Sequence, residues 1–367
     1  MNILFCGGGT SGHITPAIAI AEKITELNAD AKIAFVGRAG GLENRTIEKR
    51  GHKLYTLPIE GIQRSLSLKN IKRFCLALNS INRAKKIISE FEPDIVVGTG
   101  GYVCWPVIEA ARSMKIKTAL HESNSTPGLV TKLLYKKCDL MLLGCDNEFK
   151  GLYKHKNLKK VGNPTLGDFG KITRREARRI LHLTPNEKFI LSVGGSGGAS
   201  VLNDMAIGLM SSFSVKNKNI RHLHGCGDRY YKEIQNSHPD LCGNKKLKCR
   251  ILPSIENMAV CLAAADLVIS RCGAITLAEI ALSGTPAILI PSPNVTANHQ
   301  LKNAKAFSES GAAILIEESE LTAERLLSEC KKIIFGKEVG EILKKSLCAL
   351  AAPDAAKNSA EEILRLL

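Results

Sequence analysis

Two short apolar runs, far apart in the chain, each lead directly into a cluster of glycines. Residues 2–6 (NILFC) run into GGGTSGH, and residues 189–193 (FILSV) run into GGSGGA. A glycine turn between a buried strand and a helix is typical of a phosphate-binding βαβ unit, because backbone N–H groups can approach an anion closely there. Two such units favour an α/β fold built from two parallel sheets.

The rest of the sequence continues this alternation, with short apolar runs bounded by Gly or Pro between stretches of helical period. A length of 367 residues exceeds one ordinary domain. We therefore predict two Rossmann-like, doubly wound domains facing across a cleft, residues 1–163 with a terminal helix at about 350–367, and residues 164–349. In the first half the expected strands are residues 2–6, 32–36, 95–97, 118–120 and 140–143.

The charge balance points to an anionic partner, since 51 Lys and Arg residues face 35 Asp and Glu residues and give a formal charge of +16. Nucleic acid is disfavoured because aromatic residues make up 5% of the chain, Trp105 is the single tryptophan, and no nucleic-acid-binding module is recognisable. We find neither a signal peptide nor an apolar run of about 20 residues, so we expect no export and only peripheral membrane contact. The cysteines form no CxxC pair, which favours small buried residues over a zinc site.

The first glycine loop satisfies GxGxxG, which is a weak signal by itself. The acidic residue of an NAD site is missing, because the second expected strand is followed by Arg38, and an NADP-dependent oxidoreductase stays open on that basis. The second glycine loop instead favours two comparable anion sites. His13 lies in the first turn of the expected helix and can point beside a bound anion, although a lone histidine is more often structural.

In the second half, Arg271, Thr276 and Glu279 cluster around SRCGAITLAE. If a helix begins near Ala274, Thr276 and Glu279 lie on one side of it, and the carboxylate can accept from both hydroxyls of a ribose. A helix-capping arrangement with a solvated Glu279 is the alternative. The chain has no DxD triplet, so if the ligand is a nucleotide diphosphate we expect no metal and no cofactor, with helix N-termini neutralising the leaving diphosphate.

Residues 61–89 form a basic segment with seven Lys or Arg residues and no acidic residue. Apolar residues at three- and four-residue steps predict an amphipathic helix or helix pair. Its apolar face either packs in the core or docks on anionic lipid, where each cation near the surface contributes ~1 kcal/mol.

Seven ordered motifs together resemble one family, the MurG-type UDP-N-acetylglucosamine transferases of peptidoglycan synthesis, which are two-domain GT-B enzymes of glycosyltransferase family 28. The motifs are GGGTSGH at 7–13, GGYV at 100–103, HESN at 121–124, VGNP at 161–164, GGSGGA at 194–199, SRCGAITLAE at 270–279 and PSPNVTANHQLKNA at 291–304. The resemblance implies inverting transfer of GlcNAc from UDP-GlcNAc to the C4 hydroxyl of undecaprenyl-diphosphate-linked MurNAc-pentapeptide, the conversion of lipid I to lipid II.

The resemblance also implies a role for each matching residue. His13 is the expected general base, poised near neutrality. Glu279 is expected on the ribose, Ser196 near the diphosphate, Ile255 beside the uracil and Gln300 on the GlcNAc hydroxyls. The remaining donor-binding residues are Thr10, Ser11, Gly12, Asn124, Arg271, Ala274, Ile275 and Thr276. The acceptor diphosphate is expected at Gly9, Gly100, Gly101 and Tyr102.

Because that acceptor is held in a membrane, the resemblance gives the basic segment a purpose: peripheral binding to anionic lipid at the cytoplasmic face through Lys72, Arg73, Phe74, Lys85 and Lys86. Lys132, Lys136 and Lys137 are expected to assist. The chain departs from the commoner family pattern at Ser11, Ser123, Leu166, Gly197 and the pair Cys104-Trp105. A sister enzyme that transfers sugar to diacylglycerol and a non-catalytic basic scaffold or nucleic-acid-binding protein are the alternatives.

Overall fold

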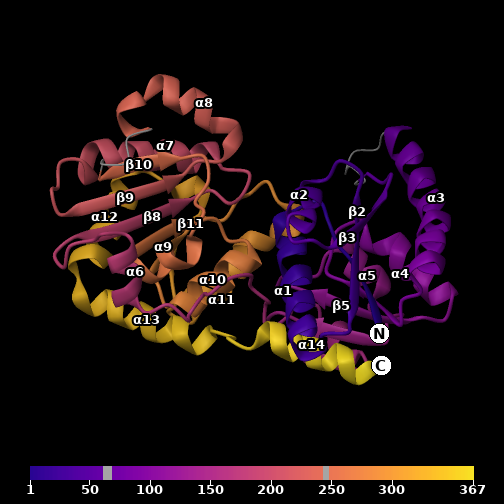
Figure 1. The fold of residues 1–367 in the computed structure, drawn as a ribbon. Coiled ribbons are helices and arrows are strands. Elements are labelled where there is room, and N and C mark those ends of the chain that lie inside the picture. Colours follow the sequence, from indigo (N-terminus) through magenta and orange to yellow (C-terminus); the bar gives the residue numbers. More distant parts are fainter. Residues whose placement is uncertain (61–67, 243–247) are drawn as a thin grey trace. The chain divides into compact units, whose positions relative to one another are not determined.

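The computed structural model describes residues 1–60, 68–242 and 248–367, which form two compact units. Unit 1 comprises Met1–Leu166 and Asp354–Leu367, and unit 2 comprises Gly167–Pro353. Each unit is a parallel sheet covered by helices on both faces (Figure 1).

Unit 1 contains a seven-stranded sheet in the order β3-β2-β1-β4-β5-β6-β7. All neighbouring strands are parallel. The central strand β1 is buried on both faces, as expected when helices cover both sides of a sheet. The strands are β1 (Asn2–Cys6), β2 (Lys32–Arg38), β3 (Lys53–Leu57), β4 (Ile95–Gly98), β5 (Lys117–Glu122), β6 (Leu140–Leu143) and β7 (Leu158–Lys160).

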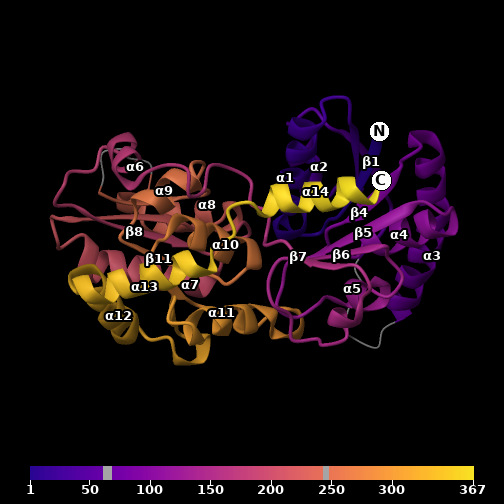
Figure 2. The ribbon, with the colours of Figure 1, turned by 90° about the horizontal axis from the view of Figure 1, so that it is seen from below.

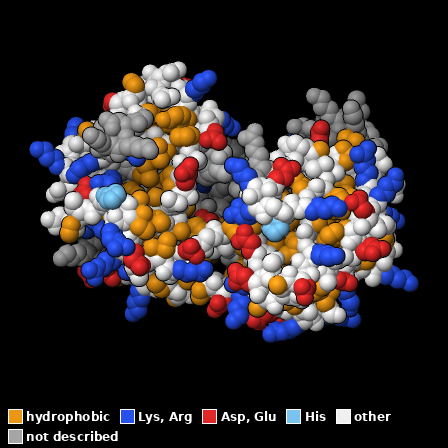
Figure 3. Space-filling model, viewed as in Figure 1, with side chains coloured by type: hydrophobic (Ala, Val, Ile, Leu, Met, Phe, Trp, Pro, Cys, Tyr) orange, Lys and Arg blue, Asp and Glu red, His pale blue; other side chains and the backbone are white. Residues whose placement is uncertain are grey.

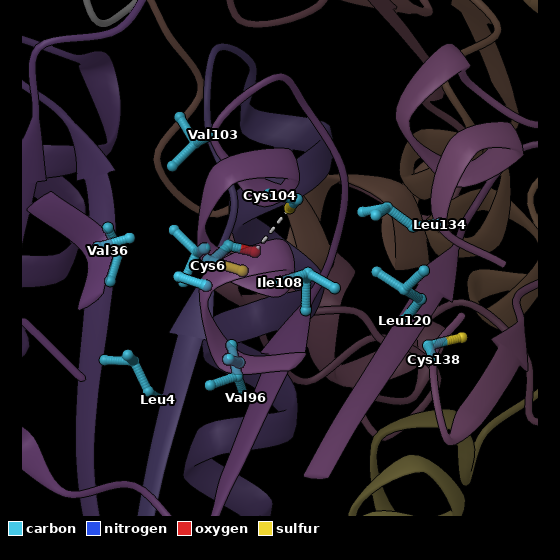
Figure 4. Close-up of a cluster of buried hydrophobic side chains, with 14 of the residues drawn as sticks. Leu4, Cys6, Val36, Val96, Val103, Cys104, Ile108, Leu120, Leu134 and Cys138 are labelled. Atoms are coloured by element: carbon cyan, nitrogen blue, oxygen red, sulfur yellow. Dashed lines mark hydrogen bonds between the residues drawn. The ribbon is translucent and has the colours of Figure 1, made fainter. Parts of the chain in front are cut away.

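The helices of unit 1 divide between the two faces of its sheet. On one face, α3, α4 and α5 pack against alternate residues of the strands such as Leu4 and Cys6, and Cys104 at the start of α4 donates its Sγ–H to the Cys6 carbonyl at 3.0 Å (Figure 4). On the other face, α14 lies beside α1 and buries Ala360 and Ile363 (Figure 2). The helices are α1 (Ser11–Leu27), α2 (Leu42–Glu48), α3 (Leu68–Phe91), α4 (Cys104–Ser113), α5 (Leu129–Leu134) and α14 (Ala355–Leu366), with a short turn η1 (Leu152–Lys154).

Unit 2 repeats the topology with six parallel strands in the order β10-β9-β8-β11-β12-β13. Counted from the first strand of the unit, this is the 3-2-1-4-5-6 order of a dinucleotide-binding fold. The strands are β8 (Lys188–Val193), β9 (Ile220–Gly225), β10 (Cys249–Leu252), β11 (Leu267–Ser270), β12 (Ala287–Leu289) and β13 (Ile314–Leu315). The helices are α6 (Arg174–Ile180), α7 (Ser200–Leu209), α8 (Asp228–Ser237), α9 (Met258–Ala264), α10 (Ala274–Ser283), α11 (His299–Glu309), α12 (Ala323–Phe335) and α13 (Lys337–Leu350), with a π-helical segment η2 (Met210–Ser214) and short 3-10 turns η3 (Pro239–Leu241), η4 (Thr296–Asn298) and η5 (Glu318–Glu320).

The structure confirms the predicted two-sheet fold, and each strand expected in the first half lies within an observed strand. Two strands of unit 1 were not predicted, β3 and the edge strand β7. The sequence KLYTL of β3 is partly exposed, and β7 is the tripeptide LKK, whose lysines protect a sheet edge rather than filling a core. The predicted amphipathic segment contains a single helix, α3, and residues 61–67 lie outside the described residues. Of the eleven cysteines with described side chains, nine are buried.

Candidate functional site

The strand order of unit 1 places the carboxyl ends of β1 and β4 next to each other. Cys6 pairs with Gly98, so the glycine loop 7–9 that follows β1 lies beside the turn 99–101 that follows β4. Ligands of doubly wound sheets bind outside the carboxyl ends of the strands at this reversal of strand order. Two motifs about 90 residues apart are therefore brought together at the edge where a ligand is expected.

The two glycine segments pack so closely that side chains are excluded. Gly100 and Gly101 have φ angles of +112° and +83°, in the region that favours glycine. A Cβ at position 100 would lie 2.6 Å from His13 Cδ2, and one at position 101 would lie 2.2 Å from the Gly8 carbonyl oxygen. The ring of Tyr102 closes against Gly9, where a Cβ would lie 3.1 Å from Cε1. The structure thus brings together Gly9, Gly100, Gly101 and Tyr102, the residues predicted to hold the acceptor diphosphate.

His13 lies in the first turn of α1 with its ring against this glycine turn. Its Nδ1 is 3.1 Å from the Gly8 carbonyl oxygen and 3.2 Å from Thr10 Oγ1. A carbonyl oxygen only accepts, so Nδ1 carries the hydrogen in the neutral ring and Nε2 holds the lone pair. Thr99 Oγ1 donates to the His13 carbonyl at 2.7 Å and fixes the backbone of the helix start. The arrangement prepares Nε2 to accept a proton.

The start of α1 has the properties of an anion site. Thr10 is the N-cap residue, and its side chain does not cap the helix. Thr10 and Ser11 are exposed and Gly12 is half-buried. The backbone N–H groups of the first helical turn and these exposed hydroxyl groups can therefore contact the same anion.

Asn124 follows β5, and its position is set by the buried carboxylate of Glu122. Glu122 Oε1 accepts from the Asn124 backbone N–H at 3.0 Å and from its Nδ2 at 3.1 Å. Glu122 Oε2 accepts from the Gly128 N–H at 3.0 Å and from Thr131 Oγ1 at 2.7 Å. One carboxylate therefore organises the whole turn that carries Asn124.

Unit 2 repeats the junction, with the carboxyl ends of β8 and β11 adjacent. Loop 194–199 leaves β8 and leads into α7, whose N-cap Ala199 offers no side-chain cap. Gly195 and Gly198 have φ angles of +83° and +69°, and Ser196 is exposed at the tip of the loop. The loop therefore presents backbone amide groups and one hydroxyl at a helix start, a suitable site for a phosphate.

Helix α10 begins at Ala274 after the N-cap Gly273, which makes no side-chain cap. The capping alternative for Glu279 is wrong, because Glu279 lies in the second turn and is half-buried rather than solvated. Among the described residues none donates a hydrogen bond to its carboxylate, and burial raises the pKa of Glu279 from 4.5 to about 7. Ala274, Ile275 and Thr276 form the first turn of this helix.

Arg271 and Gln300 brace the loops around the start of α10. The Arg271 guanidinium donates to the carbonyl oxygens of Ile290 at 3.2 Å and Pro291 at 3.1 Å, and its Nη1 lies 2.6 Å from Glu318 Oε2. Gln300 Oε1 accepts from the backbone N–H groups of Cys272 at 3.3 Å and Ser292 at 2.9 Å, so its NH₂ group is the part oriented for donation. Contact of Arg271 or Gln300 with the donor substrate stays a prediction. Ile255 is half-buried, and a Cβ at Gly225 would lie 3.3 Å from it.

Comparison with known proteins identifies this arrangement. Residues 3–143 match the glycosyltransferase family 28 N-terminal domain, and residues 189–359 match the glycosyltransferase family 28 C-terminal domain. The chain belongs to glycosyltransferase family 28. It is an enzyme family of the GT-B fold, so the dehydrogenase and non-catalytic alternatives find no support here.

Relatives of this family 28 enzyme match it along its whole length. The UDP-N-acetylglucosamine--N-acetylmuramyl-(pentapeptide) pyrophosphoryl-undecaprenol N-acetylglucosamine transferase of Halalkalibacterium halodurans is 39% identical over 97% of both chains. The enzyme of the same name from Thermoanaerobacter sp. strain X514 is 36% identical over 100% of this chain and 99% of its own. Among solved structures, MurG of Acinetobacter baumannii aligns with a TM-score of 0.73 at 25% identity, covering 99% of each chain.

The predicted membrane residues of the family 28 enzyme are only partly described. The side chains of Lys72, Arg73 and Phe74 lie outside the described residues, while Lys85 is half-buried and Lys86 exposed on α3. Lys and Arg side chains recur along the edge of unit 1 where Figure 1 draws α3 (Figure 3). Within residues 1–60, 68–242 and 248–367, no helix is long and apolar enough to cross a membrane. The same residues contain no cluster of three or more His, Cys, Asp or Glu side chains that could hold a metal.

Sequence reasoning gave no role to two residues that organise the site. Thr99 holds the backbone of His13, and Glu122 holds the turn of Asn124. Glu122 stands inside the HESN motif at the end of a buried strand, where an acidic residue needs several donors, and this was the available signal. Of the departures from the family pattern, Cys104 is buried with its thiol bonded to backbone, and Leu166 packs on the core of unit 1.

Proposed function

We propose that this family 28 glycosyltransferase transfers GlcNAc from UDP-GlcNAc to the C4 hydroxyl of undecaprenyl-diphosphate-linked MurNAc-pentapeptide, with inversion at the anomeric carbon. The relatives that match the whole chain carry the name of this transferase. The observation that carries the proposal in the structure is the His13 cluster, in which a ring nitrogen with a lone pair adjoins two glycine segments suited to an anion.

In the proposed step, His13 Nε2 takes the proton of the acceptor C4 hydroxyl while its oxygen forms the new bond to C1 of GlcNAc. The bond between C1 and the donor phosphate oxygen breaks, and UDP leaves with the electron pair. Gly8 keeps Nδ1 protonated and stabilises the imidazolium through its carbonyl oxygen. Gly100 and Gly101 let their turn pack directly against the His13 ring and Gly8, and in this proposal the acceptor diphosphate binds at the glycine backbone next to them.

The donor is held by unit 2 in this proposal. The diphosphate binds at Ser196 and the uncapped start of α7, and the developing charge on UDP is neutralised by backbone amide groups. Glu279 accepts from the two ribose hydroxyls, which gives its carboxylate hydrogen-bond donors that the described part of the protein does not supply. Asn124 and the turn 10–12 of unit 1 contact the sugar.

We further propose that the enzyme binds anionic lipid peripherally at the cytoplasmic face of the cell membrane and has no nucleic-acid partner. A patch on unit 1 combines exposed apolar side chains with cations: Leu129 and Leu133 on α5 are 66% and 50% exposed. Lys132 Nζ lies 5.8 Å from the Phe149 ring, and Lys150 Nζ lies 5.5 Å from the Tyr153 ring. Apolar residues flanked by lysines fit the interface of an anionic bilayer.

The reaction is tested by UDP release from UDP-GlcNAc with a lipid I analogue, with diacylglycerol, or with no acceptor. We expect release only with the lipid I analogue. His13→Ala should lower kcat by about 10²–10⁴-fold, the usual contribution of a general base, whereas His238→Ala at the end of α8 should leave it unchanged. Glu279→Ala should raise the donor KM. Release with diacylglycerol alone would replace the proposed acceptor, and full activity of His13→Ala would remove the proposed base.

Lipid binding is tested by cosedimentation with anionic vesicles. Replacement of Leu129 and Leu133 by Ser should weaken binding, while the same change at Ile342 and Leu350, which are 55% and 40% exposed on unit 2, should not. Replacement of Lys85 and Lys86 by Ser should reduce the salt sensitivity of binding. Equal binding of all these variants would refute the proposed membrane surface.

A further inference from the structure

Five polar side chains form a continuous buried chain inside unit 2. Ser192 lies on β8, and His222 and His224 lie on the neighbouring strand β9. Asn203 lies on α7 and Ser214 on η2, and each of the five residues is at most 2% exposed. The contacts in order are Ser214 Oγ to His222 Nδ1 at 3.2 Å, His222 Nε2 to Ser192 Oγ at 2.9 Å, Ser192 Oγ to His224 Nδ1 at 2.8 Å, and His224 Nε2 to Asn203 Oδ1 at 3.0 Å.

The Asn203 end of this chain fixes which His224 nitrogen donates to the helix. Asn203 Nδ2 donates to the Cys226 carbonyl oxygen at 3.2 Å. A carbonyl cannot donate, so Asn203 Oδ1 faces His224 and the His224 Nε2 carries a hydrogen. His224 Nδ1 faces two groups of Ser192, its Oγ at 2.8 Å and its carbonyl oxygen at 3.1 Å, so this one residue of β8 holds the other side of the ring.

On the other side of Ser192, the ring of His222 joins β8 to η2. His222 Nε2 lies 2.9 Å from Ser192 Oγ, and His222 Nδ1 lies 3.2 Å from Ser214 Oγ. Burial lowers the pKa of His222 to about 3 and that of His224 to about 4, so both rings are neutral. The contacts therefore run without interruption from Ser214 to the Asn203 amide, which donates to the Cys226 carbonyl.

The Cys226 carbonyl lies directly against loop 194–199 of unit 2. A Cβ at Gly198 would lie 2.0 Å from the Cys226 oxygen, so loop and carbonyl are in close contact. Asn203 also donates its backbone N–H to the Ala199 carbonyl at 2.9 Å, at the point where the loop enters α7. The end of the buried chain thus ties the β9 side of the loop to its α7 side.

We propose that the part of this chain from Ser192 through His224 to Asn203 is a positioning network that sets the conformation of loop 194–199 and, through it, the affinity for a nucleoside diphosphate. The assignment of that ligand rests on the proposed function. None of these side chains needs to touch the ligand, because the network acts through the Cys226 carbonyl and the start of α7. Within the network, His224 occupies the decisive place, since its ring joins Ser192 on β8 to Asn203 on α7.

The test compares His224→Leu, which breaks the chain at Asn203, with His224→Gln, whose amide nitrogen can still donate to Asn203. Ser214→Ala, at the far end of the chain, is the matched control. UDP affinity is measured by calorimetry, and hydrogen exchange of a peptide covering 194–203 reports the loop without ligand. We expect His224→Leu to weaken UDP binding about tenfold and to speed exchange, with His224→Gln and Ser214→Ala within about twofold of the unchanged protein.

If His224→Leu does not fold, Ser192→Ala is the second variant, because it removes the hydroxyl between the two histidines and adds no bulk. It should give the same changes in UDP affinity and in hydrogen exchange of the loop. Unchanged loop exchange and unchanged UDP affinity in a folded His224→Leu or Ser192→Ala variant would overturn the network. Equal loss in His224→Gln and Ser214→Ala would also overturn it, because that result indicates general destabilisation. If the unchanged protein binds no UDP, the proposed function fails, and loop exchange still decides the network.

Discussion

Glu279→Gln should make the protein more stable at alkaline pH while weakening donor binding. Burial raises the pKa of Glu279 from 4.5 to about 7, and no described residue donates a hydrogen bond to its carboxylate, so the folded protein retains a proton that the unfolded chain releases between these values. Stability from this group is therefore present below pH 4.5 and lost as pH rises through 7. The loss amounts to about 3 kcal/mol in full, and to about 2 kcal/mol between pH 5.5 and 8.5. Gln has the same shape without the titration and should escape it.

The assay is urea unfolding of both proteins at pH 5.5 and 8.5. Hydrogen exchange of peptides from β8 and β11 monitors the unfolding of unit 2. The difference in unfolding free energy between Glu279→Gln and the unchanged protein should shift by about 2 kcal/mol in favour of the variant at the higher pH. Trp105 is the only tryptophan and lies in unit 1, so its fluorescence provides an internal control that should not move. Glu233→Gln, at an exposed position of α8, is the matched variant.

The same carboxylate should report donor binding. The ribose hydroxyls stabilise the ionised form, so UDP binding near pH 7 should release up to about half a proton, and calorimetry in two buffers of different ionisation enthalpy measures it. Glu279→Gln should show no release and weaker binding. A stability difference that does not change with pH would refute the burial argument, and proton release that persists in the variant would remove Glu279 from the ribose.

Three other predictions test the interior of each unit by itself. Because His222 and His224 are neutral in the folded protein and titrate near 6.5 when unfolded, unit 2 should lose about 4 kcal/mol between pH 7.5 and 5.0 in urea unfolding, and His222→Leu should lose about half of that. Gly101→Ala should destabilise unit 1 by more than the ~1 kcal/mol expected for Gly51→Ala, where φ is also positive but no atom lies within 4 Å; equal urea midpoints would contradict the close contact. Glu122→Gln should cost about 2–3 kcal/mol by Trp fluorescence in urea, because an amide cannot accept all four hydrogen bonds, and an unchanged midpoint would show that the turn does not need the charge.

The sequence predicted the fold because its signal is local and repeated. Strands such as residues 2–6 and 189–193 are buried on both faces and read as continuous apolar runs. The strand β7 could not be found this way, since two of its three residues are lysines and only pairing with β6 makes it a strand. An edge strand such as β7 forms because a neighbouring strand pairs with it, and its own short sequence does not predict that pairing.

The candidate site was predictable wherever glycine was required by backbone contact. Gly100 and Gly101 are needed because the turn rests on His13 and on the Gly8 carbonyl, and the strand order then brings the two distant motifs together. The side chains that support these loops left weaker signals. Glu122 and Thr99 act on residues close by in space but through hydrogen bonds that no spacing rule encodes.

The histidines show most clearly what the sequence alone withholds. A histidine in a sequence has two possible neutral tautomers, and the neighbour of each ring nitrogen decides which one forms. At His13 a carbonyl oxygen faces Nδ1, so Nε2 keeps the lone pair and can act as a base. At His224 the amide oxygen of Asn203 faces Nε2 and the Ser192 carbonyl oxygen faces Nδ1, so protein groups occupy both ring nitrogens and the ring serves the architecture. Both residues stand near glycine loops at the ends of parallel strands, and only their non-local partners assign one to chemistry and the other to support.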